Sequence, residues 1–126
     1  TYTIRYDSFV CNFLKHTIMI RSKIISTKLV PEGNILAITL FGLVFCRDKR
    51  RVTPRVYNHE LIHCKQQLEW LYLPFFVLYL IEWMCLWFKY RNLDLAYRNI
   101  SFEREAYDND HNFNYLKTRK AYANYR

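Results

Sequence analysis

The sequence predicts an α+β fold that is mainly helical, and three observations support this prediction. Glycine occurs only twice and proline three times in 126 residues, which disfavours long irregular loops. Hydrophobic residues make up 52% of the chain and aromatic residues 18%, which is enough to form a core and argues against disorder. One apolar segment without helical periodicity precedes several segments with helical features. The length suits one domain, so we expect residues 1–126 to form a single domain.

The first half of the chain is expected to supply the strand. Residues 8–30 mix apolar and basic positions, and they fit either one amphipathic helix or a helix followed by a strand. A turn is predicted at residues 31–34. The apolar segment 35–46 is rich in Ile, Leu, Val, Phe and Thr and has no helical periodicity, which predicts a buried strand. The basic residues that begin at Arg47 then predict a polar loop.

The second half is expected to be helical. Thr53 is a good N-cap and Pro54 suits the first helical position, so a helix should run from Pro54 to about Leu73. Pro74 should end or kink this helix, and a second, largely apolar helix is predicted over residues 75–90. A polar turn at residues 91–94 should precede a helix over residues 101–108. The structure of the tail beyond residue 111 is left open.

The segment His59-Glu60-Leu61-Ile62-His63 lies inside the first of these helices. Two histidines four residues apart lie on one helix face, where they can occupy two corners of a zinc tetrahedron. Glu60 is rotated about 100° from them, so it flanks the metal and is suited to accept a proton from zinc-bound water. This composition would produce an HExxH pattern by chance about 0.006 times. The alternative is an exposed helix whose histidines and glutamate face solvent.

A third ligand is expected from the helix over residues 101–108. A catalytic zinc ion needs three protein ligands and an open position, and a glutamate from this helix would complete a His₂Glu site. Glu103 and Glu105 are the two candidates. They are two residues apart and point to nearly opposite sides of a helix, so only one of them can reach the metal.

With this pattern the chain resembles the gluzincin-type zinc metallopeptidases, in which HExxH is followed by a glutamate on a later helix. It looks most like the membrane-linked prenyl-protein and heat-shock type and the metallopeptidase domain of β-lactam sensor-transducers. The resemblance covers about residues 53–110. It implies that Glu103 is the ligand, because Ala106 follows three residues later, whereas Tyr107 stands where the family has an aspartate. Tyr107 is therefore a candidate for a supporting hydrogen bond to the metal site or for an oxyanion donor.

The resemblance also implies a compact zincin-like domain with an HExxH helix, a short β-sheet or hairpin and a glutamate-bearing helix. An edge strand near residues 35–46 would bind a peptide or protein substrate by strand addition. One Zn²⁺ ion per chain would polarise the scissile carbonyl and its bound water. Glu60 would take the water proton and pass it to the leaving amine. Two alternatives stay open, namely a catalytically silent zinc-binding scaffold and a membrane- or partner-binding module with an incidental HExxH.

Residues 71–90 are nearly long enough to cross a membrane, but Pro74 and Glu82 interrupt them. We expect this segment to be core, to lie in a membrane interface, or to form a homodimer face. Glu82 should pair with a lysine or arginine or face a partner.

The net charge of +8 suits an anionic membrane surface, whereas nucleic acid is disfavoured because no reader motif is present. The basic residues at 47–55 and in the tail are expected to be solvated, with Lys117, Arg119, Lys120 and Arg126 forming the tail group.

The remaining residues of interest have modest expected roles. Cys11, Cys46, Cys64 and Cys85 form no CxxC pair and are expected to be free thiols, which favours an intracellular or membrane-associated protein. Gln66 and Gln67 continue the HExxH helix and are weak candidates for contacts that support the metal site. His111 is expected to be solvated.

Overall fold

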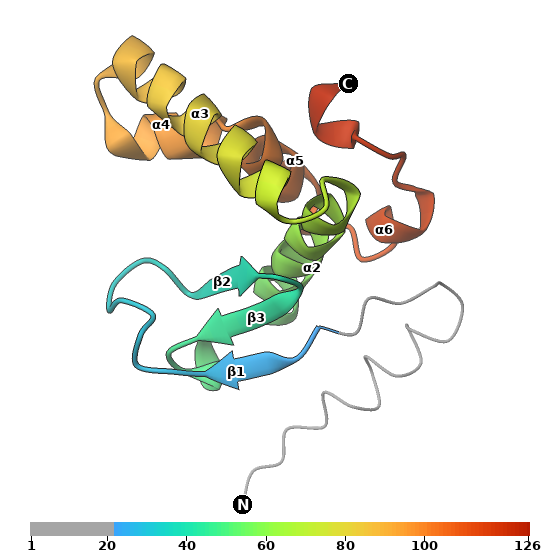
Figure 1. The fold of residues 1–126 in the computed structure, drawn as a ribbon. Coiled ribbons are helices and arrows are strands. Elements are labelled where there is room, and N and C mark those ends of the chain that lie inside the picture. The colour runs from blue at the N-terminus through green and yellow to red at the C-terminus, as the bar shows by residue number, and fades with distance from the viewer. Residues whose placement is uncertain (1–21) are drawn as a thin grey trace, which may run out of the picture.

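The computed structural model describes residues 22–126 and contains a small mixed sheet against a set of helices (Figure 1). Strands β1 (Ile24–Ser26), β2 (Ala37–Leu40) and β3 (Leu43–Cys46) form the sheet in the order β1-β3-β2. β1 runs parallel to β3, and β2 runs antiparallel to it. The prediction of an α+β, mainly helical fold is therefore confirmed. Most of the segment 8–30, for which a helix was expected, lies outside the described residues.

The segment 35–46 is not one continuous strand. It folds back on itself as the hairpin of β2 and β3, which agrees with the short β-sheet or hairpin that the resemblance implied. Phe41 and Gly42 form the turn, and both have positive φ values, of 51° and 75°. Glycine adopts this region without steric cost, so the turn is placed where the chain has one of its two glycines. β2 is one of the two edge strands, and Gln67 ties it to the first long helix by donating to the Thr39 carbonyl.

The first long helix, α2 (Pro54–Glu69), follows the short 3₁₀ turn η1 (Lys49–Arg51). Thr53 caps α2 as predicted, since its hydroxyl accepts a hydrogen bond from the Val56 amide at 3.2 Å. α2 ends about four residues earlier than predicted, because Leu71 and Tyr72 adopt positive φ values of 53° and 63°. Pro74 then lies in the first turn of α3 (Leu73–Tyr90), where proline is tolerated.

Four short helices follow α3, namely α4 (Leu93–Asn99), α5 (Ser101–Asn109), α6 (Tyr115–Thr118) and the 3₁₀ turn η2 (Ala123–Tyr125). The polar turn expected at residues 91–94 is shorter than predicted, because Asn92 caps α4 by accepting a hydrogen bond from the Leu95 amide. α4 packs beside α3, and α5 crosses near α2 (Figure 1). The C-terminal segment thus passes α2 and α5 after leaving the α3–α4 pair.

The apolar core lies between α3 and the start of α5. Phe75, Ile100 and Phe102 are buried, and Trp83 and Leu86 of α3 pack against them. No residue in the described range 22–126 covers the other side of α3. This helix is long and apolar enough to cross a membrane, yet only 6% of it is buried inside the protein. The prediction that residues 71–90 belong to the core therefore holds for only one face of α3.

Most of the basic residues at 47–55 and in the tail are exposed, as predicted. Arg47 pairs with Glu32 and Arg50 pairs with Asp48 within the loop region, so part of the 47–55 charge is neutralised locally. The prediction that the tail is solvated is wrong for Arg119, whose side chain is only 1% exposed. It is buried because two carboxylates from α2 and α5 surround it.

Candidate metal centre

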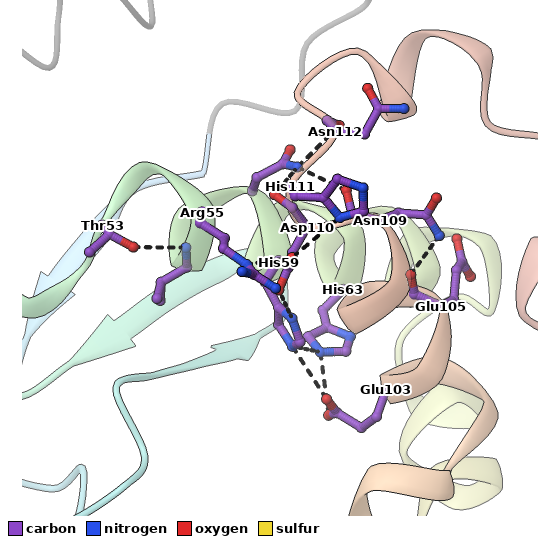
Figure 2. A network of polar contacts seen from close by, with 12 residues as sticks. Thr53, Arg55, His59, His63, Glu103, Glu105, Asn109, Asp110, His111 and Asn112 are labelled. Carbon is purple, nitrogen blue, oxygen red and sulfur yellow. Dashed lines mark hydrogen bonds and ion pairs between the residues drawn. The ribbon is translucent and has the colours of Figure 1, made fainter.

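α2 and α5 bring His59, His63 and Glu103 together inside the protein. The helical repeat of α2 places both imidazoles on one face, and their Nε2 atoms lie 3.1 Å apart. Glu103 lies in the first turn of α5 and faces them, with 3.3 Å from each of its oxygens to one histidine Nε2 (Figure 2). All three side chains are buried, and their potential ligand atoms lie within 4.8 Å of one another.

Gln66 determines which nitrogen of His63 faces Glu103. The Gln66 amide group donates to the Phe102 carbonyl at 3.0 Å and to Glu105 Oε2 at 2.9 Å. These two bonds leave the amide oxygen facing His63 Nδ1 at 2.8 Å, so Nδ1–H donates to it. The lone pair of His63 Nε2 then points toward His59 and Glu103. Gln66 is fully buried, which keeps this arrangement in place.

Asp110 and Tyr107 surround His59. Asp110 Oδ2 lies 3.7 Å from His59 Nδ1, and Asp110 is itself held by Arg55 at 2.7 Å (Figure 2). The ring of Tyr107 packs edge-on against the His59 ring, with 4.6 Å between centroids. The acidic side chain near His59 is thus Asp110, about one helical turn beyond Tyr107. The sequence predicts no role for Asp110.

These residues fit a bound cation. Two imidazole nitrogens and a carboxylate converge, and Glu103 Oε2 is buried with no hydrogen-bond partner among the described residues. Three electron-pair donors at this separation repel one another unless a proton or a metal ion lies between them. Two nitrogen ligands and one oxygen ligand form a set that zinc accepts.

Without a metal, a proton on His63 can hold the histidines and Glu103 together, and the pKa values of His63 and Glu103 indicate this. Burial by itself would lower the pKa of His63, but the neighbouring Glu103 carboxylate outweighs this effect and raises it to about 9. Burial would likewise raise the pKa of Glu103. The charge of protonated His63, the neighbouring imidazole of His59 and the Tyr79 hydroxyl outweigh it and hold that pKa well below its usual range.

Glu60 lies beside this group but outside it. It is only 6% exposed, and the Thr39 hydroxyl of β2 donates to its carboxylate. Thr39 therefore fixes the Glu60 side chain between α2 and the edge strand β2. The sequence offered no local signal for this contact, because the two residues are 21 positions apart.

Glu105, the rival ligand, points away from the histidines. It accepts hydrogen bonds from Gln66, Tyr115 and Arg119, and Arg119 also binds Glu69 at the end of α2. Glu105 thus supports the candidate metal centre of His59, His63 and Glu103 indirectly, because it binds Gln66, which in turn binds His63. The two-residue spacing separates Glu103 and Glu105 onto different sides of α5, as helical geometry requires.

Three other residues from the sequence analysis lie away from the group. Cys64 is buried against the Ser22 hydroxyl, and burial raises the pKa of its thiol to about 11. The His111 side chain is 67% exposed. Among the described residues Glu82 pairs with no lysine or arginine, and it accepts hydrogen bonds from Ser101 and Tyr125 instead.

Two clefts reach the group from either side of Glu60. One has a volume of about 470 Å³ and is lined by residues that include His59, Tyr97, Tyr107 and Asp110. The other has a volume of about 310 Å³ and includes His63, Glu103 and the residues of β2. Glu60 and Tyr97 line both clefts. A ligand in either cleft would therefore contact Glu60 and have access to the group.

The role of the His59, His63 and Glu103 group is inferred from its geometry, because comparison with known proteins finds no relative. No protein-family model, curated protein or solved structure matches the chain.

Proposed function

We propose that this protein is a zinc-dependent peptide hydrolase that holds one Zn²⁺ ion on His59, His63 and Glu103. The observation that carries the proposal is the convergence of these three buried side chains beside a carboxylate that is not one of them, Glu60. A structural site has no need of such a carboxylate, whereas hydrolysis needs a base next to the metal.

The number of ligands supports a catalytic site over a structural one. In the part of the chain that the structure describes, no fourth histidine, cysteine, aspartate or glutamate joins the group. Structural zinc sites are closed by four protein ligands, whereas catalytic sites keep the fourth position open for water or substrate. The clefts beside the group supply the space that this position requires.

Glu60 is the proposed general base. When bound, zinc supplies a Lewis acid and lowers the pKa of a coordinated water to about 7. As the water oxygen bonds to the carbonyl carbon, Glu60 would accept its proton and, as the C–N bond breaks, would return it to the nitrogen of the departing amine. The Thr39 hydroxyl holds the carboxylate in position for both transfers, because it donates to Glu60 Oε2.

Two tyrosines are candidates to stabilise the negative charge that develops on the substrate oxygen. Tyr97 and Tyr107 line the cleft of about 470 Å³ together with His59. A tyrosine hydroxyl is protonated at neutral pH, and partial burial together with the nearby Glu103 carboxylate raises the pKa of Tyr97 further, so its hydroxyl can donate a hydrogen bond. A donor in this position stabilises a developing oxyanion more than it stabilises a neutral carbonyl.

The edge strand β2 offers a place for the peptide chain. β2 lies at the edge of the sheet, and its residues line the cleft that holds Glu60 and Glu103. An extended peptide can pair with such an edge through main-chain hydrogen bonds, which places its own amide groups along the cleft. This geometry favours a peptide over a small, compact substrate.

The proposal is tested with Glu60→Gln, beside Glu32→Gln as a control at an exposed glutamate. Elemental analysis should find one zinc per chain in all three proteins. Hydrolysis of a peptide library should fall about a hundredfold to ten-thousandfold in Glu60→Gln and stay unchanged in the control. Undiminished hydrolysis by zinc-loaded Glu60→Gln would rule out the proposed base. Zinc binding without hydrolysis by the unaltered protein would support the silent scaffold instead.

A further inference from the structure

Helix α3 has two faces of different character. Its inner face carries Phe75, Tyr79, Trp83 and Leu86, which pack on the core between α3 and α5. Its outer face carries a stripe of exposed apolar side chains at helical spacing, and their exposed fractions run from 46% to 67%: Leu73, Val77, Leu80, Ile81, Met84 and Phe88. Side chains of this kind are exposed to water at a cost that a nonaqueous contact would remove.

The one charged residue within residues 73–88 does not interrupt this stripe. Glu82 is turned inward, where it accepts hydrogen bonds from the Ser101 amide and hydroxyl and from the Tyr125 hydroxyl. From the sequence alone, a carboxylate at position 82 disfavours contact with lipid. The structure removes that objection for the outer face, because the carboxylate is satisfied on the opposite side of the helix.

The apolar surface continues beyond the N-terminal end of α3. Phe41, in the turn of the β2–β3 hairpin, packs against Tyr72 and Phe76 with ring centroids 5.8 Å and 5.4 Å away. Phe41 is still 58% exposed and Leu71 is 76% exposed. Both have left-handed backbone conformations, which such side chains rarely adopt. We call Phe41, Leu71 and the outer face of α3 the apolar ridge.

Cationic residues lie at the other end of the ridge. Lys89 and Arg91 follow directly after Phe88, and their charged groups lie over the rings of Tyr90 and Phe88 at 5.0 Å and 5.7 Å. Lysine, arginine and aromatic residues at the end of an apolar helix are typical of the boundary between lipid tails and headgroups.

We propose that the apolar ridge binds the surface of an anionic lipid bilayer, with α3 lying in the plane of the interface. α3 has 18 residues and is about 27 Å long, so its whole outer face can be immersed at one depth. The net charge of +8 and the terminal cations favour a bilayer that contains anionic lipid.

Two features favour this orientation over a helix that crosses the bilayer. α4 packs along α3 and exposes Asp94 and Arg98, which a crossing orientation would carry into the hydrocarbon. The inner face of α3 is also committed to the core of the protein. Only the outer face is therefore available to lipid.

Two other features favour lipid over a second copy of the chain as the occupant of the ridge. The ridge is a projecting row of mainly aliphatic side chains, whereas interfaces between proteins are enriched in aromatic and arginine anchors. Two copies would also bring together chains that each carry a net charge of +8.

The first experiment is flotation of the full chain with phosphatidylcholine vesicles, with and without phosphatidylglycerol. We expect binding to both, and tighter binding to the anionic vesicles by about fivefold for each cation that contacts them. The double variant Leu80→Glu/Met84→Glu should lose at least about tenfold in partitioning, because each added carboxylate must enter the interface. The control Leu29→Glu/Phe113→Glu makes the same charge change at exposed positions outside the ridge and should float like the unaltered protein.

Cys85 allows a second readout on the helix itself, because it is exposed on α3 while Cys46 and Cys64 are buried. In a Cys11→Ser background, a maleimide reagent should modify Cys85 in solution and be slowed when anionic vesicles are added. Circular dichroism and zinc content should be unchanged in every variant, which separates this proposal from that of a zinc hydrolase.

Absence of flotation would overturn the proposal. A dimer in sedimentation that Leu80→Glu/Met84→Glu dissociates would then assign the ridge to a second copy. A monomer whose Cys85 is protected from the maleimide in the absence of vesicles would show that another segment of the same chain covers the ridge.

Discussion

The two long helices reverse the usual relation between polarity and burial. α2 is the more polar, yet six of the nine residues that it buries are polar: Asn58, His59, Glu60, His63, Gln66 and Gln67. α3 is the more apolar, yet it buries only Phe75. Buried polar groups are tolerated when each has a partner, and exposed apolar groups are tolerated when something other than water contacts them. The comparison therefore separates a helix whose buried polar groups find partners within the described chain from one whose apolar outer face no described residue covers.

Arg119 allows the first and largest test of the polar side of this comparison. It is the common partner of Glu69 and Glu105, and all three side chains are at least nine-tenths buried. Arg119→Met keeps the apolar length of the side chain but leaves both carboxylates unpaired. The free energy of unfolding in urea should fall by about 3–5 kcal/mol. Lys120→Met, at the exposed neighbour, should change it by less than about 0.5 kcal/mol. Equal effects at both positions would contradict the buried network.

The pH dependence of the metal centre is the second test. In the metal-free protein the pKa of His63 is about 9, against 6.5 for an ordinary histidine, so the folded state holds this proton more tightly than the unfolded state. The resulting stabilisation is complete below pH 6.5 and is lost as the pH rises through 9.

Zinc must displace the same proton, so its apparent affinity should rise about tenfold per pH unit up to pH 9 and then level off. Competition with a chromophoric chelator, corrected for the chelator's own protonation, measures this slope. A zinc affinity that does not change between pH 7 and pH 9 would show that His63 is not protonated in the metal-free protein.

Gln66 and Gln67 provide the third test, since they are equally buried neighbours with different partners. Gln66 orients His63, whereas Gln67 binds the Thr39 carbonyl and the Gly42 amide. Gln66→Met should weaken zinc binding by about 10–100-fold, as loss of an outer partner of a metal ligand does. Gln67→Met should destabilise the fold but leave zinc affinity unchanged. If both variants lose zinc equally, the orienting role of Gln66 is wrong.

The fourth test concerns the outer face of α3, where a substitution should have the smallest effect on the free energy of unfolding. Ile81 is 52% exposed on the outer face of α3, so Ile81→Ser should change the free energy of unfolding in water by no more than about 0.5 kcal/mol. Phe75→Ala, on the inner face, should cost about 3–5 kcal/mol. Thermal or urea unfolding in vesicle-free buffer compares the two. A large loss from Ile81→Ser would show that the outer face is already covered in solution.

The elements that the sequence predicted well depend on local signals. The N-cap Thr53, Pro54 and the four-residue histidine spacing are all read within one or two helical turns, and so is the separation of Glu103 from Glu105. The zinc ion, the hydrolytic activity and the peptide substrate stay predictions, because neither the fold nor a known relative tests them.

The features that were missed depend on contacts between distant segments. Asp110 reaches Arg55 across 55 positions, and Arg119 reaches Glu69 across 50. Neither pair has a local pattern that marks it, and a buried arginine in a polar tail runs against composition. The hairpin turn at Gly42 was also missed, because the apolar run on both sides of it obscured a single glycine.

In the proposed membrane-bound state, the contact between Tyr79 and Glu103 would set the height of the metal centre above the lipid. Tyr79 lies on the inner face of α3 and donates to Glu103 at 2.7 Å, so the helix proposed to touch lipid on one side touches the metal group on the other. A helix with its side chains is about 10–12 Å across. A hydrolase docked through the apolar ridge would thus carry its reactive centre about one helix diameter above the lipid. Its reach would favour chain segments that emerge just above the headgroups over peptides free in solution.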